Sequence, residues 1–347
     1  MAISNSMDFL QLFIAVFIAF SIAFRAHRKK SLSTSGAIAG FFVMALHIFV
    51  GYRFGAMLLA FFYSSSTLTK VGEDIKRIVD PEFKEGGQRN WIQVLANSGI
   101  ASVLVVAIWV LTEGKDKCLN SEESPLITAL IGAVIGHYSC CNGDTWSSEL
   151  GILSDEKPRL ITTFKLDTVM LHRILMMTDS CEGFKMFHLI DNLSSDGSDS
   201  SSDGYPMVGW GIGRARSLRF VKKGTNGGVT KRGLLAAAAA GSVIGLSFVL
   251  LGISATRCEG NGSTVLKQLL VIPIATLAGL CGSVIDSLLG ATLQFTGFCS
   301  IRGKMVGKPG PTVRRISGAN ILDNNAVNFV SILLTSFFTS IACLYIF

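Results

Sequence analysis

The chain has 347 residues, of which 49% are hydrophobic and only 16% are charged, and its mean hydropathy is +0.49. Soluble domains average about 25% charged residues, so this composition excludes an ordinary soluble protein, a collagen, a disulfide scaffold and a disordered chain. The 36 glycines and only 7 prolines are typical of closely packed transmembrane helices, in which small residues let two backbones approach. We therefore expect an all-α integral membrane protein.

Apolar stretches long enough, or nearly so, to cross about 30 Å of hydrocarbon predict a polytopic bundle of about eight transmembrane helices. They cover residues 9–24, 36–51, 54–67, 93–112, 125–140, 233–256, 267–290 and 326–345. The first stretch is short. Residues 36–67 could also form one kinked element instead of a hairpin, which would leave seven spans.

The distribution of lysine and arginine predicts the orientation, because these residues accumulate on the cytoplasmic side of membrane proteins. With the N-terminus outside, the inner segments hold 26 of the 31 basic residues. These segments are 25–35, 68–92, 141–232 and 291–325. We therefore interpret the net charge of +7 as a signal of topology, and expect the lipid bilayer as a partner and no nucleic acid.

A polar segment at residues 166–220 divides the apolar pattern. It contains the tract SSDGSDSSSDG at 194–204, which lacks the apolar residues that a core requires. We predict an N-terminal membrane region at 1–165 with five spans, a low-complexity cytoplasmic insertion at 166–220, and a C-terminal membrane region at 221–347 with three spans.

The eight cysteines form no CxxC pair and no metal-like spacing with histidine. Cys118 and Cys258 fall in predicted outer loops, where one disulfide could form. The alternative is that all eight are thiols packed among helices.

Two aspartates stand at the predicted inner ends of apolar spans. Asp144 follows Gly143 after the fifth span, where a carboxylate suits Mg²⁺, although a turn that caps a following helix explains it as well. Asp286 interrupts an otherwise apolar run, at a cost of about 3 kcal/mol, which favours a functional role over a structural polar pair.

A glycine-rich basic loop precedes the sixth span. Its backbone N–H groups, the dipole of the following helix and the two lysines would all favour a phosphate, although the Walker A spacing is missing and a flexible loop is the alternative. The candidate phosphate-binding residues are Lys222, Lys223, Gly224, Thr225, Asn226, Gly227 and Gly228.

Two weaker clusters lie on the same predicted face. Asn324 and Asn325, at the start of the last span, could bond a nucleotide base or sugar, and a helix cap explains them almost as well. The stretch KEGGQRNW at 84–91 could help to bind a phosphate. His47, inside the second span, is interpreted as a helix-packing contact.

Asp144 and Asp286 on one membrane face, with the glycine-rich loop between them, predict a metal–nucleotide site that receives a lipid from the bilayer. The same residues carry a resemblance. GDTWSSELG (143–151), KGTNGGV (223–229), DSLLGATLQ (286–294) and DNNAVN (323–328) resemble, in this order, the transmembrane protein 19 family of integral membrane proteins.

That family includes the plant phytyl-phosphate kinase of tocopherol synthesis, and one plant branch is named for a regulatory role in the response to glucose. The resemblance covers nearly the whole chain. Residues 166–220 depart from it, because in relatives ITTFK (161–165) runs almost directly into the glycine-rich loop.

The resemblance implies a phosphoryl transfer from CTP or ATP to a prenyl phosphate, with Mg²⁺ as cofactor. The motif order is also similar to CTP-using lipid enzymes in which paired aspartates hold metal. By motif, Asp144 and Asp286 would be the catalytic and metal-binding residues, and the glycine-rich loop would bind phosphate. The plasma membrane is the expected location, with the endoplasmic reticulum and the chloroplast envelope as alternatives.

Two other classes of function remain open. The chain could be a non-catalytic membrane regulator of glucose-responsive growth, in which case the aspartates would not be needed for its effect. It could be a transporter, although its polar clusters gather on one face and not at the midplane. The sequence does not set the oligomeric state.

Overall fold

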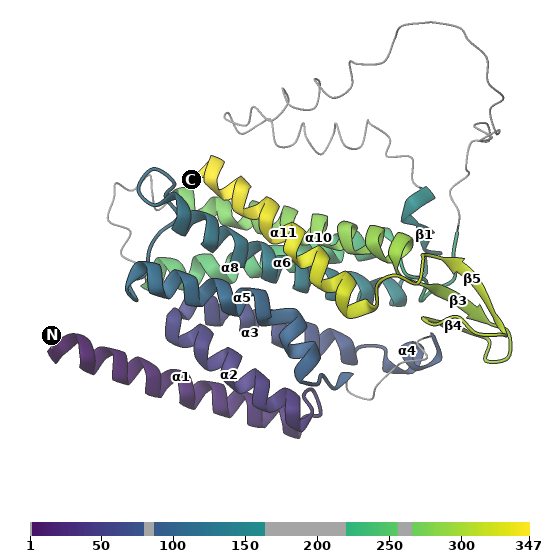
Figure 1. Cartoon of the computed structure of the whole chain (residues 1–347), viewed down its shortest axis with the longest axis horizontal. Coiled ribbons are helices and arrows are strands. Elements are labelled where there is room, and N and C mark those ends of the chain that lie inside the picture. Colours follow the sequence, from purple (N-terminus) through teal and green to yellow (C-terminus); the bar gives the residue numbers. More distant parts are fainter. Residues whose placement is uncertain (1, 80–86, 164–219, 256–265) are drawn as a thin grey trace, which may run out of the picture. The chain divides into compact units, whose positions relative to one another are not determined.

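The structure is a computed structural model that describes residues 2–79, 87–163, 220–255 and 266–347 (Figure 1); of 2–8 and 253–255 it describes only the helical backbone. The chain divides into two compact units, residues 1–161 with 220–347 and residues 162–219. The second unit lies almost entirely outside the described residues, and so does the predicted tract at 194–204.

The first unit is built from nine α-helices in its described part. They are α1 (Ala2–Arg28), α2 (Thr34–Val50), α3 (Tyr52–Lys70), α4 (Glu73–Val79), α5 (Trp91–Thr112), α6 (Pro125–Leu153), α8 (Lys231–Ala255), α10 (Val271–Leu293) and α11 (Asn324–Ile346). Two short 3₁₀ turns, η2 (Ile161–Thr163) and η5 (Gln268–Leu270), complete the helical elements. The predicted all-α polytopic membrane fold is confirmed.

Every predicted span is helical, but six helices among the described residues are long and apolar enough to cross a membrane. These six segments are Phe9–Arg28, Trp91–Thr112, Pro125–Leu153, Lys231–Gly252, Gln268–Leu293 and Asn324–Ile346. The two remaining predicted spans are α2 and α3. At 17 residues α2 reaches only about 26 Å, and α3 contains the serine run 64–66. The two helices are separate, because Gly51 takes an extended backbone between them (φ 178°, ψ 137°).

Helix α6 is the centre of the bundle and packs against α8, α10, α11, α5 and α3. Its predicted end at residue 140 is wrong, because the helix continues without a break to Leu153. The glycine that suggested a turn, Gly143, instead lies where α6 touches α10: a Cβ there would stand 2.4 Å from the carbonyl oxygen of Gly279. Asp144 is therefore on a helix and caps nothing.

Glycines also bring α8 against α10. A Cβ on Gly241 would stand 2.1 Å from the carbonyl oxygen of Ala275, and one on Gly279 would stand 2.7 Å from that of Ala237. Since lipid tails are as apolar as side chains, such close packing replaces the hydrophobic effect as the force that holds membrane helices together.

Two small sheets, which the sequence did not predict, lie at one end of the helices (Figure 1, right). Strand β1 (Arg159–Leu160) pairs antiparallel with β2 (Gly228–Val229). Strand β3 (Thr296–Cys299) is central in an antiparallel sheet between β4 (Lys304–Val306) and β5 (Val313–Ser317), with a register shift at Thr296/Gly297.

The four predicted inner segments meet at this end. Ser33 N donates to Arg89 O at 3.0 Å, and Lys304 Nζ donates to Arg77 O at 3.2 Å. The segments 141–232 and 291–325 are also connected, because Asn226 N donates to Thr296 Oγ1 at 3.3 Å. We call this end of the bundle the inner end.

At the opposite end of the bundle, a buried arginine of α3 contacts the connection between α5 and α6. Arg53, only 2% exposed, pairs with Asp116 and donates from Nη2 to Lys117 O at 2.6 Å. Cys118, beside them, is disulfide-bonded. Its predicted partner Cys258 lies outside the described residues.

Replacing Gly241 by alanine is expected to lower stability by about 1–3 kcal/mol, because the new methyl group must push α8 away from the backbone of α10. The measurement is the thermal unfolding midpoint of the purified protein in detergent. Gly99→Ala is the matched control: a Cβ there meets no atom within 4 Å, so the midpoint should not fall. Equal midpoints for the two variants would contradict the packing of α8 on α10.

Candidate functional site

The two predicted aspartates meet at the contact between α6 and α10. Asp144 and Asp286 are half-buried, and their side chains lie within hydrogen-bond contact of each other. The approach depends on glycines: Gly143 lies on Gly279, and a Cβ on Gly282 would stand 2.6 Å from Cys140 Sγ. The carboxyl groups stand nine and seven residues before the inner ends of their helices, at Leu153 and Leu293.

Helix α11 adds polar groups to the pair. Ser331 Oγ donates to Asp286 Oδ2 at 3.1 Å. The amide of Asn328 lies 3.3 Å from the same carboxylate oxygen. With its nitrogen toward Asp286 it donates there and to Asn324 O at 3.1 Å; with its oxygen toward Asp286 it adds an acceptor to the same point.

Two carboxylates in such contact repel each other strongly away from bulk water, so a proton or a cation must lie between them. The groups around them are carboxylate, amide and hydroxyl, the oxygen donors that Mg²⁺ prefers. In the described part of the chain, no group of three or more His, Cys, Asp or Glu side chains is placed to hold a metal ion. This donor set fits Mg²⁺, which takes one or two carboxylates and completes its octahedron with water and phosphate oxygens.

The glycine-rich loop lies directly on the helix that carries Asp286. Gly227 has φ +75°, and a Cβ there would stand 2.3 Å from Ala291 Cβ and 2.6 Å from Ser287 O. Only glycine fits this approach without moving the loop. The structure thus brings the loop to the residue that follows Asp286.

Several polar groups of the loop already have partners. Thr225 Oγ1 donates to Lys222 O at 2.7 Å, Asn226 N donates to Thr296 Oγ1, and Gly228 N donates to Thr225 O at 3.0 Å. Gly224, with φ +83°, and Lys222 are exposed, and the Lys222 ammonium lies 3.6 Å from the centroid of the Phe298 ring. An incoming phosphate would meet these exposed groups.

The asparagines at the start of α11 lie at the same end. Asp323 caps the helix by accepting from Ala326 N at 2.8 Å. Asn324 Oδ1 accepts from Gln294 Nε2 at 3.4 Å, and Asn325 is exposed. The cap explains Asp323, whereas the asparagine side chains remain accessible to a ligand.

Other polar residues near the site crosslink helices, and sequence reasoning missed them. Asn142 Oδ1 accepts from Ser64 Oγ at 2.9 Å and Ser65 Oγ at 3.2 Å, while its Nδ2 donates to Ala240 O at 3.0 Å. The side chain therefore joins α3, α6 and α8. Three serines in succession inside an apolar helix are the sequence signal that could have identified this contact.

An ion pair and a histidine bond provide two further crosslinks. Lys76 Nζ of α4 lies 2.5 Å from Glu149 Oε2 of α6. His47 lies 2.6 Å from the Tyr138 hydroxyl through Nε2, which supports its interpretation as a packing contact.

The fold and the site define a polytopic helical membrane protein with paired carboxylates toward one end of its helices. The chain belongs to the integral membrane protein family DUF92, whose sequence model matches residues 17–168 and 214–336. That match leaves out 169–213, within the segment set apart by composition. Membership of this family places the chain in a lipid bilayer.

Two relatives extend this comparison. The chain is 57% identical over 337 residues to Protein PGR of Arabidopsis thaliana. This alignment covers 97% of this chain and 98% of the relative. It is 24% identical over 299 residues to an uncharacterized membrane protein of Methanocaldococcus jannaschii, covering 86% and 89% of the two chains. No solved structure matches.

Mg²⁺ is expected to raise the unfolding midpoint of the wild-type protein and to leave that of Asp286→Asn unchanged. A ligand that binds only the folded state stabilises it by about 2.7 kcal/mol at a hundredfold excess over Kd. Without Mg²⁺, Asp286→Asn should be at least as stable as the wild type, because it removes a like-charge contact.

The control is Asp155→Asn, which changes a carboxylate that is 95% exposed. This variant should show the wild-type response to Mg²⁺. An equal response in all three proteins would place the cation away from the aspartate pair.

Proposed function

We propose that the protein phosphorylates a lipid phosphate at the cytoplasmic face of its membrane, using a nucleoside triphosphate and Mg²⁺. The observation that supports this most directly is the contact of Asp144 with Asp286 beside the glycine-rich loop. In the reaction, the terminal phosphoryl group would pass to a phosphate oxygen of the lipid, giving a lipid diphosphate and a nucleoside diphosphate.

Each part of the site has a separate role in this proposal. Asp144 and Asp286 would hold Mg²⁺, which when bound neutralises charge on the transferring phosphoryl group. The loop residues from Lys222 to Gly228 would position the nucleotide phosphates. Asn324 and Asn325, at the rim, would bond the base or sugar.

The substrate class in the proposal comes from the resemblance to the transmembrane protein 19 family, which includes phytyl-phosphate kinase. A prenyl monophosphate is the expected acceptor, with CTP or ATP as donor. The plasma membrane remains the expected location, with the endoplasmic reticulum and the chloroplast envelope as alternatives.

A non-catalytic regulator of glucose-responsive growth is the second candidate. It is supported by the 57% identity to the plant protein PGR, together with the regulatory branch of the family that the sequence resembles. A transporter has less support, because both aspartates stand toward the same end of their helices.

The test of the proposal is label transfer from CTP or ATP to a panel of prenyl monophosphates, with purified protein and Mg²⁺. Asp144→Asn and Asp286→Asn should each lose at least about a hundredfold in kcat, because each removes charge stabilisation from the transferring group. Asp155→Asn should keep wild-type activity. If folded wild-type protein neither transfers label nor binds nucleotide, the regulator is the better account.

The loop has its own matched pair of variants. Gly227→Ala should raise the KM for the nucleotide, since the methyl group would collide with Ala291 and displace the loop. Gly303→Ala has the same left-handed backbone strain, at φ +65°, but its methyl group meets nothing within 4 Å. Equal KM values for the two variants would separate the loop from nucleotide binding.

A further inference from the structure

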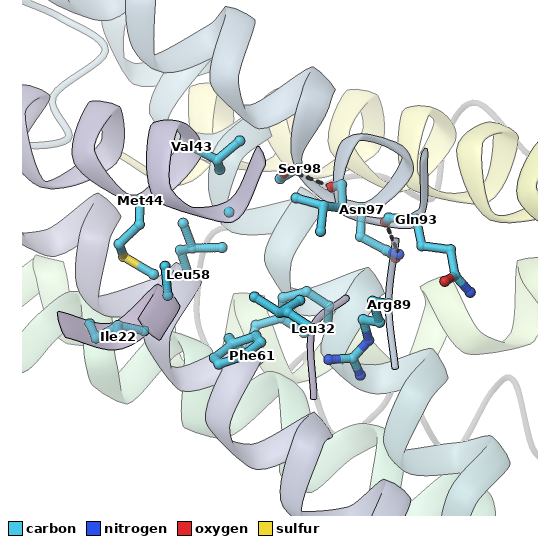
Figure 2. A pocket seen from close by; sticks show the side chains of 14 residues that line it. Ile22, Leu32, Val43, Met44, Leu58, Phe61, Arg89, Gln93, Asn97 and Ser98 are labelled. Carbon is cyan, nitrogen blue, oxygen red and sulfur yellow. Dashed lines mark hydrogen bonds between the residues drawn. The ribbon is translucent and has the colours of Figure 1, made fainter. Parts of the chain in front are cut away.

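An apolar cavity lies between α1, α2, α3 and α5 (Figure 2), and neither Asp144 nor Asp286 lines it. Its walls include Ile22, Met44, Leu58 and Phe61, from three of these helices. The cavity volume is about 60 Å³, several times what one water molecule needs, yet these walls offer a water few hydrogen-bond partners. A space of this size has room for a short stretch of a hydrocarbon chain, a few methylene groups long.

One end of the cavity is polar. Arg89, Gln93 and Asn97 line it where α5 begins, at the inner end of the bundle. The Arg89 guanidinium points into the space between these helices (Figure 2). The surface of the cavity is almost wholly apolar, and the Arg89 cation stands beside it at the inner end of the bundle.

The backbone of Arg89 is fixed independently of its side chain. Arg89 N donates to Ser31 O at 3.1 Å, and Arg89 O accepts from Ser33 N at 3.0 Å. These bonds tie the start of α5 to the α1–α2 connection, so a change of the side chain leaves them in place.

Among the described residues, the Arg89 guanidinium has no ion-pair partner. Its Nη1 donates to Ser66 Oγ at 3.0 Å, and among the described residues no carboxylate lies within 4.0 Å of it. Burial lowers the pKa of Arg89, and the more distant Glu149 opposes this only in part. A buried cation without a paired anion is costly, and an arginine in this state binds phosphate well through its forked N–H groups.

We propose that this cavity holds a short stretch of the hydrocarbon chain of a phosphate-bearing lipid whose phosphate pairs with Arg89. The apolar walls match part of the chain, and the guanidinium matches the anionic head. This inference goes beyond the proposed phosphoryl transfer, because the lipid binds whether or not it reacts.

The test measures binding of phosphatidic acid and of phosphatidylcholine to the full-length protein in detergent by native mass spectrometry, without nucleotide. Arg89→Gln should weaken phosphatidic acid binding at least tenfold and leave the weak phosphatidylcholine binding unchanged. Arg302→Gln, which removes an exposed arginine from the β3–β4 turn, should bind as the wild type does.

A second variant tests the apolar body. Gly40→Leu places a side chain in the cavity, and its Cβ approaches only the flexible end of Leu32, at 3.3 Å. It should reduce phosphatidic acid binding at least tenfold with Arg89 intact. Arg89→Lys, which keeps the charge but loses the fork, should fall between the wild type and Arg89→Gln.

The outcomes separate this inference from the proposed function. Asp286→Asn should bind phosphatidic acid as the wild type does, even where phosphoryl transfer is lost. Unchanged binding in folded Arg89→Gln or Gly40→Leu would overturn the lipid site. Competition by inorganic phosphate with equal affinity would also overturn it, since a free phosphate site needs no apolar body.

Discussion

The close contact of α6 with α10 is the constraint on which the rest of the molecule depends. Helices in a bilayer gain little from burying apolar groups, so they associate where small residues let backbones touch. Gly143 against Gly279 is such a point. Because Asp144 follows Gly143 directly, the packing that holds the bundle together also sets the separation of the two carboxyl groups.

Two aspartates at this separation would be unfavourable if the pair had a purely structural role. An asparagine at either position would bond the opposite carboxylate without like-charge repulsion, whereas two aspartates require a shared proton or a cation. Ser331 and Asn328 steady Asp286 without neutralising it. A bound cation, as proposed above, would neutralise the pair, and the loop at Gly227 would then offer a place for the anion that such a cation brings.

Hydropathy and the loop charges were enough to predict the helices and to place the aspartates toward one face, because both signals are local. The end of α6 could not be predicted this way. Gly143 looks like a break in a single sequence, and only the partner helix shows that it is a contact. The β3–β5 sheet was missed for a related reason, since its strands are only three to five residues long, too short for a clear alternating pattern. The cavity at Arg89 depends on four helices at once, so no local pattern reports it.

Helix α3 connects the two halves of the inner end. Its Ser64 and Ser65 bond Asn142, two residues before Asp144, and its Ser66 accepts from Arg89 at the head of the cavity. The serine run lowers the hydropathy of α3, so α3 is not among the six helices that are long and apolar enough to cross a membrane. Through these serines, α3 presents hydroxyl groups to both neighbours. Helices α6 and α10 thus contribute the two carboxylates, helices α1, α2, α3 and α5 surround the cavity, and the serines of α3 contact both parts.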